Sequence, residues 1–176
     1  MIFMASEKLV DEIKSRAVKH GDFTLASGKK SSYYLDLKLA YTEPSVLKSI
    51  TEALRESAQG LDVDRVAGME LGAVPLAVTL SLELDVPFVI IRKEKKGYGA
   101  AKRFEGEIRA GENILLVEDV VTTGGSVGQA VDVIRGAGGE CKQAITVIDR
   151  LEGGTGNLQK INIDLTSILT IRDLEL

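Results

Sequence analysis

The chain of 176 residues has one Cys and three Pro, so it is poor in the residues that build disulfides and Pro-rich linkers, and it has no Trp. A single cysteine cannot form an intrachain disulfide, so we expect a reducing compartment, the cytoplasm, and a buried Cys141 that packs as a small hydrophobic side chain. No apolar run approaches the ~18 residues of a membrane helix. We therefore expect no membrane partner.

Linkers, repeats and low-complexity tracts are also missing, while hydrophobic residues make up 44% of the chain. A chain of this length can bury a substantial single core. We predict one domain over residues 1–176.

Positive charge is scarce overall, since the formal net charge is −4 and the sequence pI is about 5.2. An acidic chain without a basic groove argues against a nucleic-acid partner. One segment departs from this, and its cations are Arg92, Lys93, Lys95, Lys96, Lys102 and Arg103. Residues 92–106 lack apolar periodicity and contain Gly97 and Gly99, so we predict a mobile, cationic loop, with a solvated charge run as the alternative.

Residues 114–127, ILLVEDVVTTGGSV, carry the strongest functional signal. Residues 114–117 form the continuous apolar run of a strand buried on both faces. Residues 122–126 then offer small side chains and backbone N–H groups at the start of a helix, which favours a phosphate. Glu118 and Asp119 repel a phosphate, so sugar hydroxyls or a Mg²⁺ carried by the ligand are their expected partners. The alternative is a plain strand end followed by a helix cap.

Two common phosphate loops are excluded by their spacing. No G-x-x-x-x-G-K-[ST] occurs, and Gly97-Tyr98-Gly99 lacks the third glycine of G-x-G-x-x-G and follows a polar stretch. A cationic loop together with an anion-binding loop suits a polyanionic substrate that is covered during reaction.

Apolar runs and helical periodicity alternate along the chain. We expect a helix starting after Ser6 and ending at Gly21, a half-buried strand over residues 32–39, and a helix beginning at Pro44. The lone His20 then lies at a helix end and needs no catalytic role. Further strands are expected at residues 65–67, 88–91, 114–117 and 144–148, and further helices at 75–83 and 127–135. The order predicts an α/β fold with a mainly parallel sheet flanked by helices.

These residues resemble a known family. The run from Glu118 to Ser126 looks like the phosphoribosyl pyrophosphate (PRPP) motif of type I phosphoribosyltransferases. Residues 23–36, FTLASGKKSSYYLD, the RKEKKGYG loop and the pair Asp149-Arg150 are similar to the orotate-specific branch of that family. The resemblance covers nearly the whole chain and implies transfer of the 5-phosphoribosyl group from PRPP to orotate, with release of pyrophosphate, in pyrimidine (UMP) biosynthesis.

The resemblance also implies a role for each matching residue. Residues 122–126 would bind the 5′-phosphate, Glu118 and Asp119 the ribose hydroxyls, and Lys93 would stabilise charge as the bond breaks. Lys93, Lys96 and Asp119 form the implied catalytic set. The implied PRPP-binding residues are Arg92, Lys93, Lys96, Tyr98, Glu118, Asp119, Val120, Val121, Thr122, Thr123, Gly124, Gly125 and Ser126. The implied orotate-binding residues are Thr122, Arg150, Tyr33 and Tyr34, of which one tyrosine is expected in the core because neighbours on a strand face opposite ways.

The cofactor and assembly follow from the same resemblance. Mg²⁺ would be carried by the substrate, near Glu118 and Asp119 and without a direct protein ligand set. A homodimer is implied, with the loop of residues 92–106 shared across subunits, and residues 1–40 would form an amino-terminal hood over the base. The loop of residues 69–74 would receive pyrophosphate, although helix capping explains it as well.

Two alternatives remain open at this point. One is a phosphoribosyltransferase for a purine or uracil, and the other is a regulator of the same fold that senses PRPP without catalysis. Two positions depart from the family pattern: Tyr98 stands where many members have histidine, and Ala26 where some have lysine. A tyrosine of ordinary pKa, about 10, cannot supply an imidazolium at neutral pH.

Overall fold

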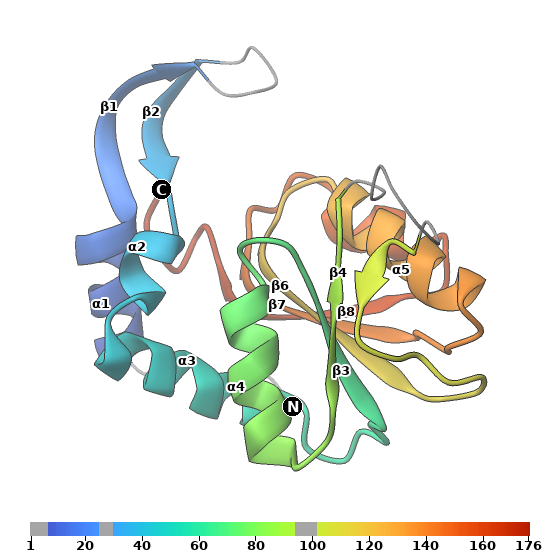
Figure 1. Ribbon diagram of the computed structural model, residues 1–176. Coiled ribbons are helices and arrows are strands. Elements are labelled where there is room, and N and C mark those ends of the chain that lie inside the picture. Colours follow the sequence, from blue (N-terminus) through green and yellow to red (C-terminus); the bar gives the residue numbers. More distant parts are fainter. Residues whose placement is uncertain (1–6, 25–29, 94–101) are drawn as a thin grey trace.

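The computed structural model describes residues 7–24, 30–93 and 102–176, and Figure 1 shows its arrangement. A six-stranded sheet in the order β5-β4-β3-β6-β7-β8 forms the centre, and a separate two-stranded hairpin, β1-β2, stands away from it. The sheet strands are β3 (Arg65–Met69), β4 (Phe88–Ile91), β5 (Phe104–Glu105), β6 (Ile114–Val121), β7 (Gln143–Asp149) and β8 (Asp164–Thr170). The hairpin strands are β1 (Val18–Thr24) and β2 (Lys30–Leu35).

Helices cover both faces of the sheet. They are α1 (Glu7–Ala17), α2 (Lys38–Tyr41), α3 (Pro44–Ser57), α4 (Val74–Leu84), α5 (Gly125–Gly136) and α6 (Gly154–Gln159). Every neighbouring pair in the sheet is parallel except β4-β5. The predicted α/β fold with a mainly parallel sheet is therefore confirmed.

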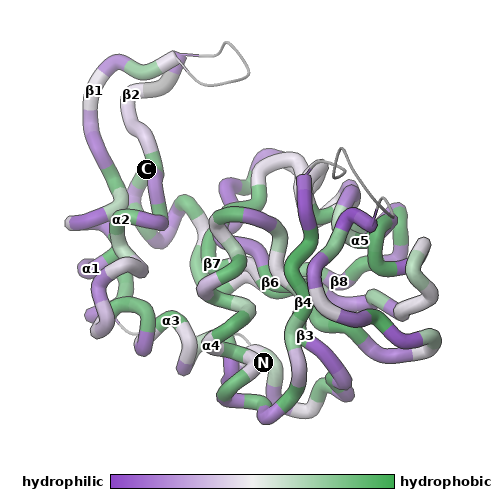
Figure 2. Tube along the Cα trace, in the orientation of Figure 1, coloured by the Kyte–Doolittle hydropathy of each residue, from purple (hydrophilic) through white to green (hydrophobic). Residues whose placement is uncertain are grey.

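Two hydrophobic cores form because successive strand residues face opposite sides of the sheet. Leu115 packs in the core with α1, α3 and α4, whereas Leu116 packs in the core with α5. Both side chains are at most 2% exposed, and full burial of such a side chain contributes roughly 1.5–3 kcal/mol. Figure 2 shows the resulting hydrophobic stretches in the central strands. The apolar run at residues 114–117 is thus explained by burial on both faces.

The expected elements near the amino terminus need correction. The first helix ends at Ala17 and not at Gly21, because β1 begins at Val18 and pairs antiparallel with β2. His20 therefore lies on a strand opposite Tyr33 and not at a helix end. The expected strand over residues 32–39 stops at Leu35, and α2 takes over from Lys38.

Pairing partners set several strand limits that hydrophobicity does not reveal. β6 continues through the two acids to Val121 because β7 pairs with it throughout, with Glu118 opposite Thr146 and Val121 opposite Asp149. The acids are therefore on the strand and not in the loop after it. No element was expected at β5, α6 or β8, of which β5 has two residues and β8 is an edge strand.

The remaining expectations agree closely with the structure. The helices at Pro44, at residues 75–83 and at 127–135 correspond to α3, α4 and α5, and Cys141 is buried. Burial raises the pKa of its thiol to about 11, so the thiol stays protonated.

No helix among the described residues is long and apolar enough to cross a membrane.

Candidate active site

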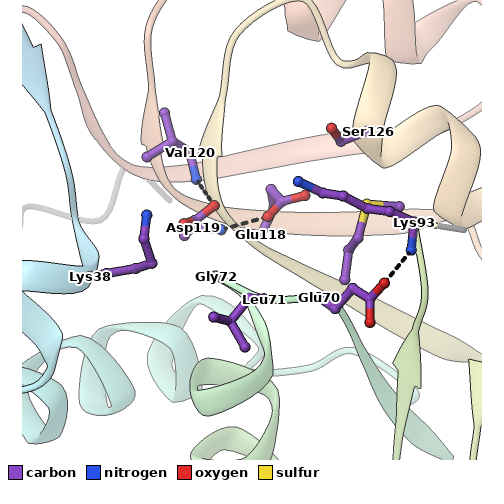
Figure 3. A pocket seen from close by; sticks show the side chains of 10 residues that line it. Lys38, Glu70, Leu71, Gly72, Lys93, Glu118, Asp119, Val120 and Ser126 are labelled. Atoms are coloured by element: carbon purple, nitrogen blue, oxygen red, sulfur yellow. Dashed lines mark hydrogen bonds between the residues drawn. The ribbon is translucent and has the colours of Figure 1, made fainter.

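A pocket of about 260 Å³ opens at the carboxyl edge of the parallel sheet, where open α/β folds bind ligands. Its lining combines residues from α2, the end of β3 and the loop after it, the segment after β4, β6 and the start of α5 (Figure 3). These residues are Lys38, Met69, Glu70, Leu71, Gly72, Lys93, Glu118, Asp119, Val120 and Ser126. Predicted site residues from three separate stretches of sequence therefore meet in one pocket.

Glu118 and Asp119 occupy the floor of this pocket (Figure 3). Glu118 Oε1 accepts a hydrogen bond of 3.1 Å from the Asp119 amide, and Asp119 Oδ1 accepts one of 2.8 Å from Val120. Glu118 is 7% exposed. Burial, followed by the neighbouring charge of Asp119, raises the pKa of Glu118 well above its usual range, while Lys93 opposes this rise. The protonated form of this carboxyl group is therefore favoured in the free site, and a bound cation or hydroxyl donor would stabilise its charged form.

The loop after β3 packs directly on Asp119. A Cβ atom added at Gly72 would lie 2.0 Å from Asp119 Oδ2, so only glycine fits there without displacing the carboxylate. Tyr41 Oη donates a 2.9 Å hydrogen bond to the Gly72 carbonyl from the other side. Burial raises the pKa of the Tyr41 hydroxyl above its ordinary value, so it remains a donor. Tyr41 and Gly72 together fix the position of this loop.

The predicted phosphate loop follows β6 and enters α5, as expected. Gly124 has φ +82°, a conformation that favours glycine, and α5 begins at Gly125. The first N–H groups of a helix have no partner within it, so they are available to an anion. Asn157 of α6 donates a 3.0 Å hydrogen bond to the Thr123 carbonyl. Helix α6, which was not expected, therefore holds the backbone of this loop in place.

Only some of the predicted phosphate-loop residues have side chains that face the pocket. Ser126 and Val120 line the pocket, and Thr122 and Thr123 are at least partly exposed. The side chain of Val121 is buried and its carbonyl accepts a 2.9 Å hydrogen bond from the Arg150 amide. Val121 therefore connects the loop to Arg150 and presents no side chain to the pocket.

Arg150 follows β7 and contacts the hairpin. Its guanidinium carbon lies 5.6 Å from the ring centre of Tyr33, and Nη2 lies 3.4 Å from the Tyr33 hydroxyl. Its Nε lies 3.0 Å from Glu152 Oε1. The structure thus brings together two of the predicted base-binding residues, next to the pocket and not in its lining.

The two tyrosines of β2 separate, as strand alternation requires. Tyr34 is 43% exposed and its ring centre lies 5.7 Å from that of Phe23. Tyr33 is partly exposed beside Arg150. The expectation that one of them belongs to the core is wrong, because the hairpin stands off the sheet and buries neither.

The cationic loop is described at both ends only. Lys93 extends toward Glu118 (Figure 3), and its amide donates a 2.9 Å hydrogen bond to Glu70 Oε1. Arg92 Nη1 lies 3.0 Å from Glu105 Oε1 of β5, so Arg92 does not line the pocket. Arg103 Nη2 donates a 2.6 Å hydrogen bond to the Lys93 carbonyl, which connects the two ends of the loop. Lys96, Tyr98 and Ala26 lie outside the described residues.

Two residues of the site were missed by the sequence reasoning, Lys38 and Tyr41. Both come from α2, and a strand was expected where α2 begins. No motif marks them, because their proximity to Asp119 and Gly72 depends on how α2 packs beside the sheet.

A metal ion at this site would need coordinating atoms from a bound substrate as well as from the protein. The pocket offers carboxylate oxygens, which Mg²⁺ prefers. Among the described residues, however, no group of three His, Cys, Asp or Glu side chains is arranged to hold an ion. The residues fit a cation that arrives with, and is partly ligated by, a bound anion.

Comparison with known proteins places this arrangement in context. Residues 40–169 match the model of the phosphoribosyl transferase domain. An orotate phosphoribosyltransferase of Methanocaldococcus jannaschii is 45% identical over 96% of this chain and 96% of its own length. The crystal structure of the Aeropyrum pernix orotate phosphoribosyltransferase superposes with a TM-score of 0.86, at 33% identity over 94% of this chain and 95% of that one. An orotate phosphoribosyltransferase of Mycobacterium tuberculosis, solved in complex with PRPP, gives a TM-score of 0.80 at 29% identity over 96% and 98%.

Proposed function

The chain belongs to the phosphoribosyl transferase domain family, and we propose that it transfers the 5-phosphoribosyl group from PRPP to orotate, giving orotidine 5′-phosphate and pyrophosphate. The observation that carries this proposal is the pocket itself. It brings together the carboxyl groups of Glu118 and Asp119, the helix start at Ser126 and the ammonium group of Lys93. This combination suits a sugar that carries a phosphate and a diphosphate, because the helix start and the lysine can bind anions while the carboxylates accept hydrogen bonds from hydroxyls. The reaction is a pentosyl transfer in pyrimidine biosynthesis.

PRPP would be held along the carboxyl edge of the sheet. The backbone N–H groups of residues 122–126 would bind the 5′-phosphate, and Glu118 and Asp119 would accept hydrogen bonds from the ribose hydroxyls. Mg²⁺ brought by the diphosphate would neutralise its charge and, beside these carboxylates, lower the raised pKa of Glu118. The M. tuberculosis relative was solved in complex with PRPP, which supports PRPP as the ligand.

Bond breaking requires stabilisation of the departing diphosphate. The bond between ribose C1 and the diphosphate oxygen breaks, which leaves an oxocarbenium-like centre that a ring nitrogen of orotate attacks. Lys93 would stabilise the negative charge that develops on the leaving group, and the loop at Gly72 would receive it. Arg92, Lys96 and Tyr98 would add contacts from the cationic loop once substrate is bound, which requires Arg92 to leave Glu105.

Orotate would bind between the hairpin and the end of β7. Arg150 suits its carboxylate because a guanidinium can pair with a carboxylate through two parallel hydrogen bonds. Tyr33, which already contacts Arg150, would cover the pyrimidine ring, with Thr122 at its edge and Tyr34 at the rim. Residues 1–40 would act as the hood of this subsite.

The assembly belongs to the same proposal. We propose a cytoplasmic homodimer in which residues 92–106 act at the partner's site, with small-molecule substrates and no nucleic-acid partner. Lys93 extends over Glu118 of its own chain in this structure, so sharing across subunits needs a direct test.

The activity is tested by mixing the purified protein with orotate, PRPP and Mg²⁺ and following the loss of orotate absorbance. Uracil, hypoxanthine and adenine serve as parallel acceptors. We expect turnover with orotate alone, and its loss when Mg²⁺ is chelated. Turnover with another base would reassign the acceptor, and no turnover with any of the four would favour a PRPP sensor.

A further inference from the structure

The pocket contains a second lysine that the proposed mechanism does not yet use. Lys38, the first residue of α2, lines the pocket on the wall opposite Lys93, with Glu118 and Asp119 between them (Figure 3). The neighbouring part of the wall is the loop of Glu70 to Gly72. A ligand in this pocket would therefore lie between two ammonium groups.

Lys38 is fixed in place by Asp36. Its Nζ lies 2.7 Å from Asp36 Oδ1, and its backbone amide donates a 3.2 Å hydrogen bond to the same oxygen. The hydrogen bond to Asp36 raises the pKa of Lys38, and the charge of Asp119 adds to this. The side chain is 47% exposed, and an ammonium group has three donors. Lys38 is thus positioned, charged and able to donate to a further acceptor.

The charges of the pocket show why a second cation is needed. Its acidic residues are Glu70, Glu118 and Asp119, which together repel a diphosphate. Among the described residues that line the pocket, only Lys38 and Lys93 are positively charged. Lys93 alone cannot balance Glu70 and Asp119, and still less these two together with Glu118 in its charged form. Arg150 lies outside the lining, next to Tyr33, so the acceptor has its own cation.

We propose that Lys38 binds the diphosphate group of PRPP, and of the pyrophosphate product, from the wall opposite Lys93. This inference rests on the proposed function and extends it to a residue that no sequence motif marks. Lys38 is accordingly a substrate-binding residue for one substrate only. Removing its ammonium group should weaken the binding of PRPP and of pyrophosphate and leave the binding of orotate unaffected.

The test compares Lys38→Ala and Lys38→Arg with a matched control, Lys142→Ala. Lys142 is also an exposed lysine that pairs with an acid two residues earlier, Glu140, but it lies at the amino end of β7, at the far edge of the sheet. Steady-state kinetics give KM for PRPP and for orotate. Calorimetry with Mg²⁺ and pyrophosphate gives a Kd that does not depend on turnover.

We expect Lys38→Ala to raise KM for PRPP and Kd for pyrophosphate by roughly tenfold or more, as for loss of a charge-assisted hydrogen bond. KM for orotate should stay within about twofold, Lys38→Arg should retain most of the affinity, and Lys142→Ala should match wild type. Melting curves establish that each variant is folded; Lys38→Gln replaces the alanine variant if it is not.

Two results would overturn the inference: unchanged PRPP and pyrophosphate affinities in Lys38→Ala, or a rise confined to KM for orotate. Failure of the proposed function shows itself differently, as absence of orotate-dependent turnover in the wild-type protein. The pyrophosphate Kd still decides the role of Lys38 in that case.

Discussion

The shape of the pocket is sensitive to the addition of a single carbon atom at Gly72. Its missing side chain lets the loop after β3 lie against the Asp119 carboxylate. A side chain as small as a methyl group would occupy the position of Asp119 Oδ2. Function at this site is therefore sensitive to substitutions that would be harmless elsewhere.

Replacing Gly72 with Ala should lower kcat/KM by about a hundredfold, because a displacement of roughly 1 Å at a reacting group costs about that much. The kinetic assay with orotate and PRPP measures this. Gly136→Ala is the matched control, since Gly136 lies in α5 and a Cβ there meets nothing within 4 Å. Wild-type activity in Gly72→Ala would show that Asp119 is not needed in its present position.

Glu118 makes stability depend on pH in an unusual direction. Its pKa is raised in the folded protein, so the folded state binds more protons than the unfolded state above the ordinary Glu pKa of about 4.3. Stability therefore falls as pH rises from about 4.3 toward the raised pKa. Mg²⁺ with PRPP should reverse part of this loss by favouring the charged form.

The variant Glu118→Gln should remove that dependence. We expect it to gain about 1 kcal/mol or more of unfolding free energy over wild type at pH 8, relative to the difference at pH 5. Urea denaturation at the two pH values measures the change. Glu140→Gln, an exposed carboxylate whose pKa is lowered by Lys142, is a control expected to show no such gain. Parallel pH profiles of wild type and Glu118→Gln would contradict the assignment.

Among the secondary-structure elements, α6 supports the predicted phosphate loop although it follows that loop in the chain only after α5 and β7. Helix α6 contacts the loop through the 3.0 Å hydrogen bond of Asn157 and through Leu158, toward which a Cβ at Gly124 would point at 3.0 Å. The loop is thus held between β6, α5 and α6. Its shape is a property of all three elements.

Asn157→Ala should loosen this loop and raise KM for PRPP by about threefold to tenfold, since a hydrogen bond contributes roughly 0.5–1.5 kcal/mol. KM for orotate should change less. Asn157→Asp removes the donor with little change of shape and should behave like the alanine variant. Gln159→Ala, an exposed residue of the same helix, controls for helix propensity; equal effects in Gln159→Ala and Asn157→Ala would contradict a specific role.

In the complete protein, the proposed sharing of residues 92–106 decides whether one chain or two build each site. Lys93 and Asp119 are close in one chain here. In a dimer that shares residues 92–106, a mixed pair of Lys93→Ala and Asp119→Asn chains would have one site with both native residues. In a dimer with self-contained sites, it would have none.

Each single variant should therefore be nearly inactive, and their mixture should recover up to about a quarter of wild-type activity if subunits exchange randomly and the loop is shared. The measurement is turnover after co-refolding the two variants in equal amounts. Recovery of untagged chains with tagged partner chains shows whether mixed dimers have formed. Recovery indistinguishable from the separate variants, with exchange demonstrated, would assign Lys93 to its own subunit.

Features that lie within one contiguous segment could be predicted from the sequence alone. The apolar run at residues 114–117, the acids after it and the Gly-rich helix start are contiguous, so their local pattern was enough to predict a buried strand and a phosphate site. The alternation of such segments also determined the mainly parallel sheet. The pairing of Glu118 to Ser126 with the cationic loop further indicated a polyanionic substrate.

Which distant residues complete the site depends on how the segments pack in three dimensions. Lys38 lines the pocket, Tyr41 bonds to the loop after β3, and Asn157 bonds to the loop after β6, all from helices whose sequences carry no motif. Strand pairing places Glu118 and Asp119 on β6 itself. Hydrophobic periodicity fixes how each segment buries its own faces, whereas strand order and helix packing fix which segments meet. Contacts such as that of Gly72 with Asp119 follow from the second and cannot be read from the first.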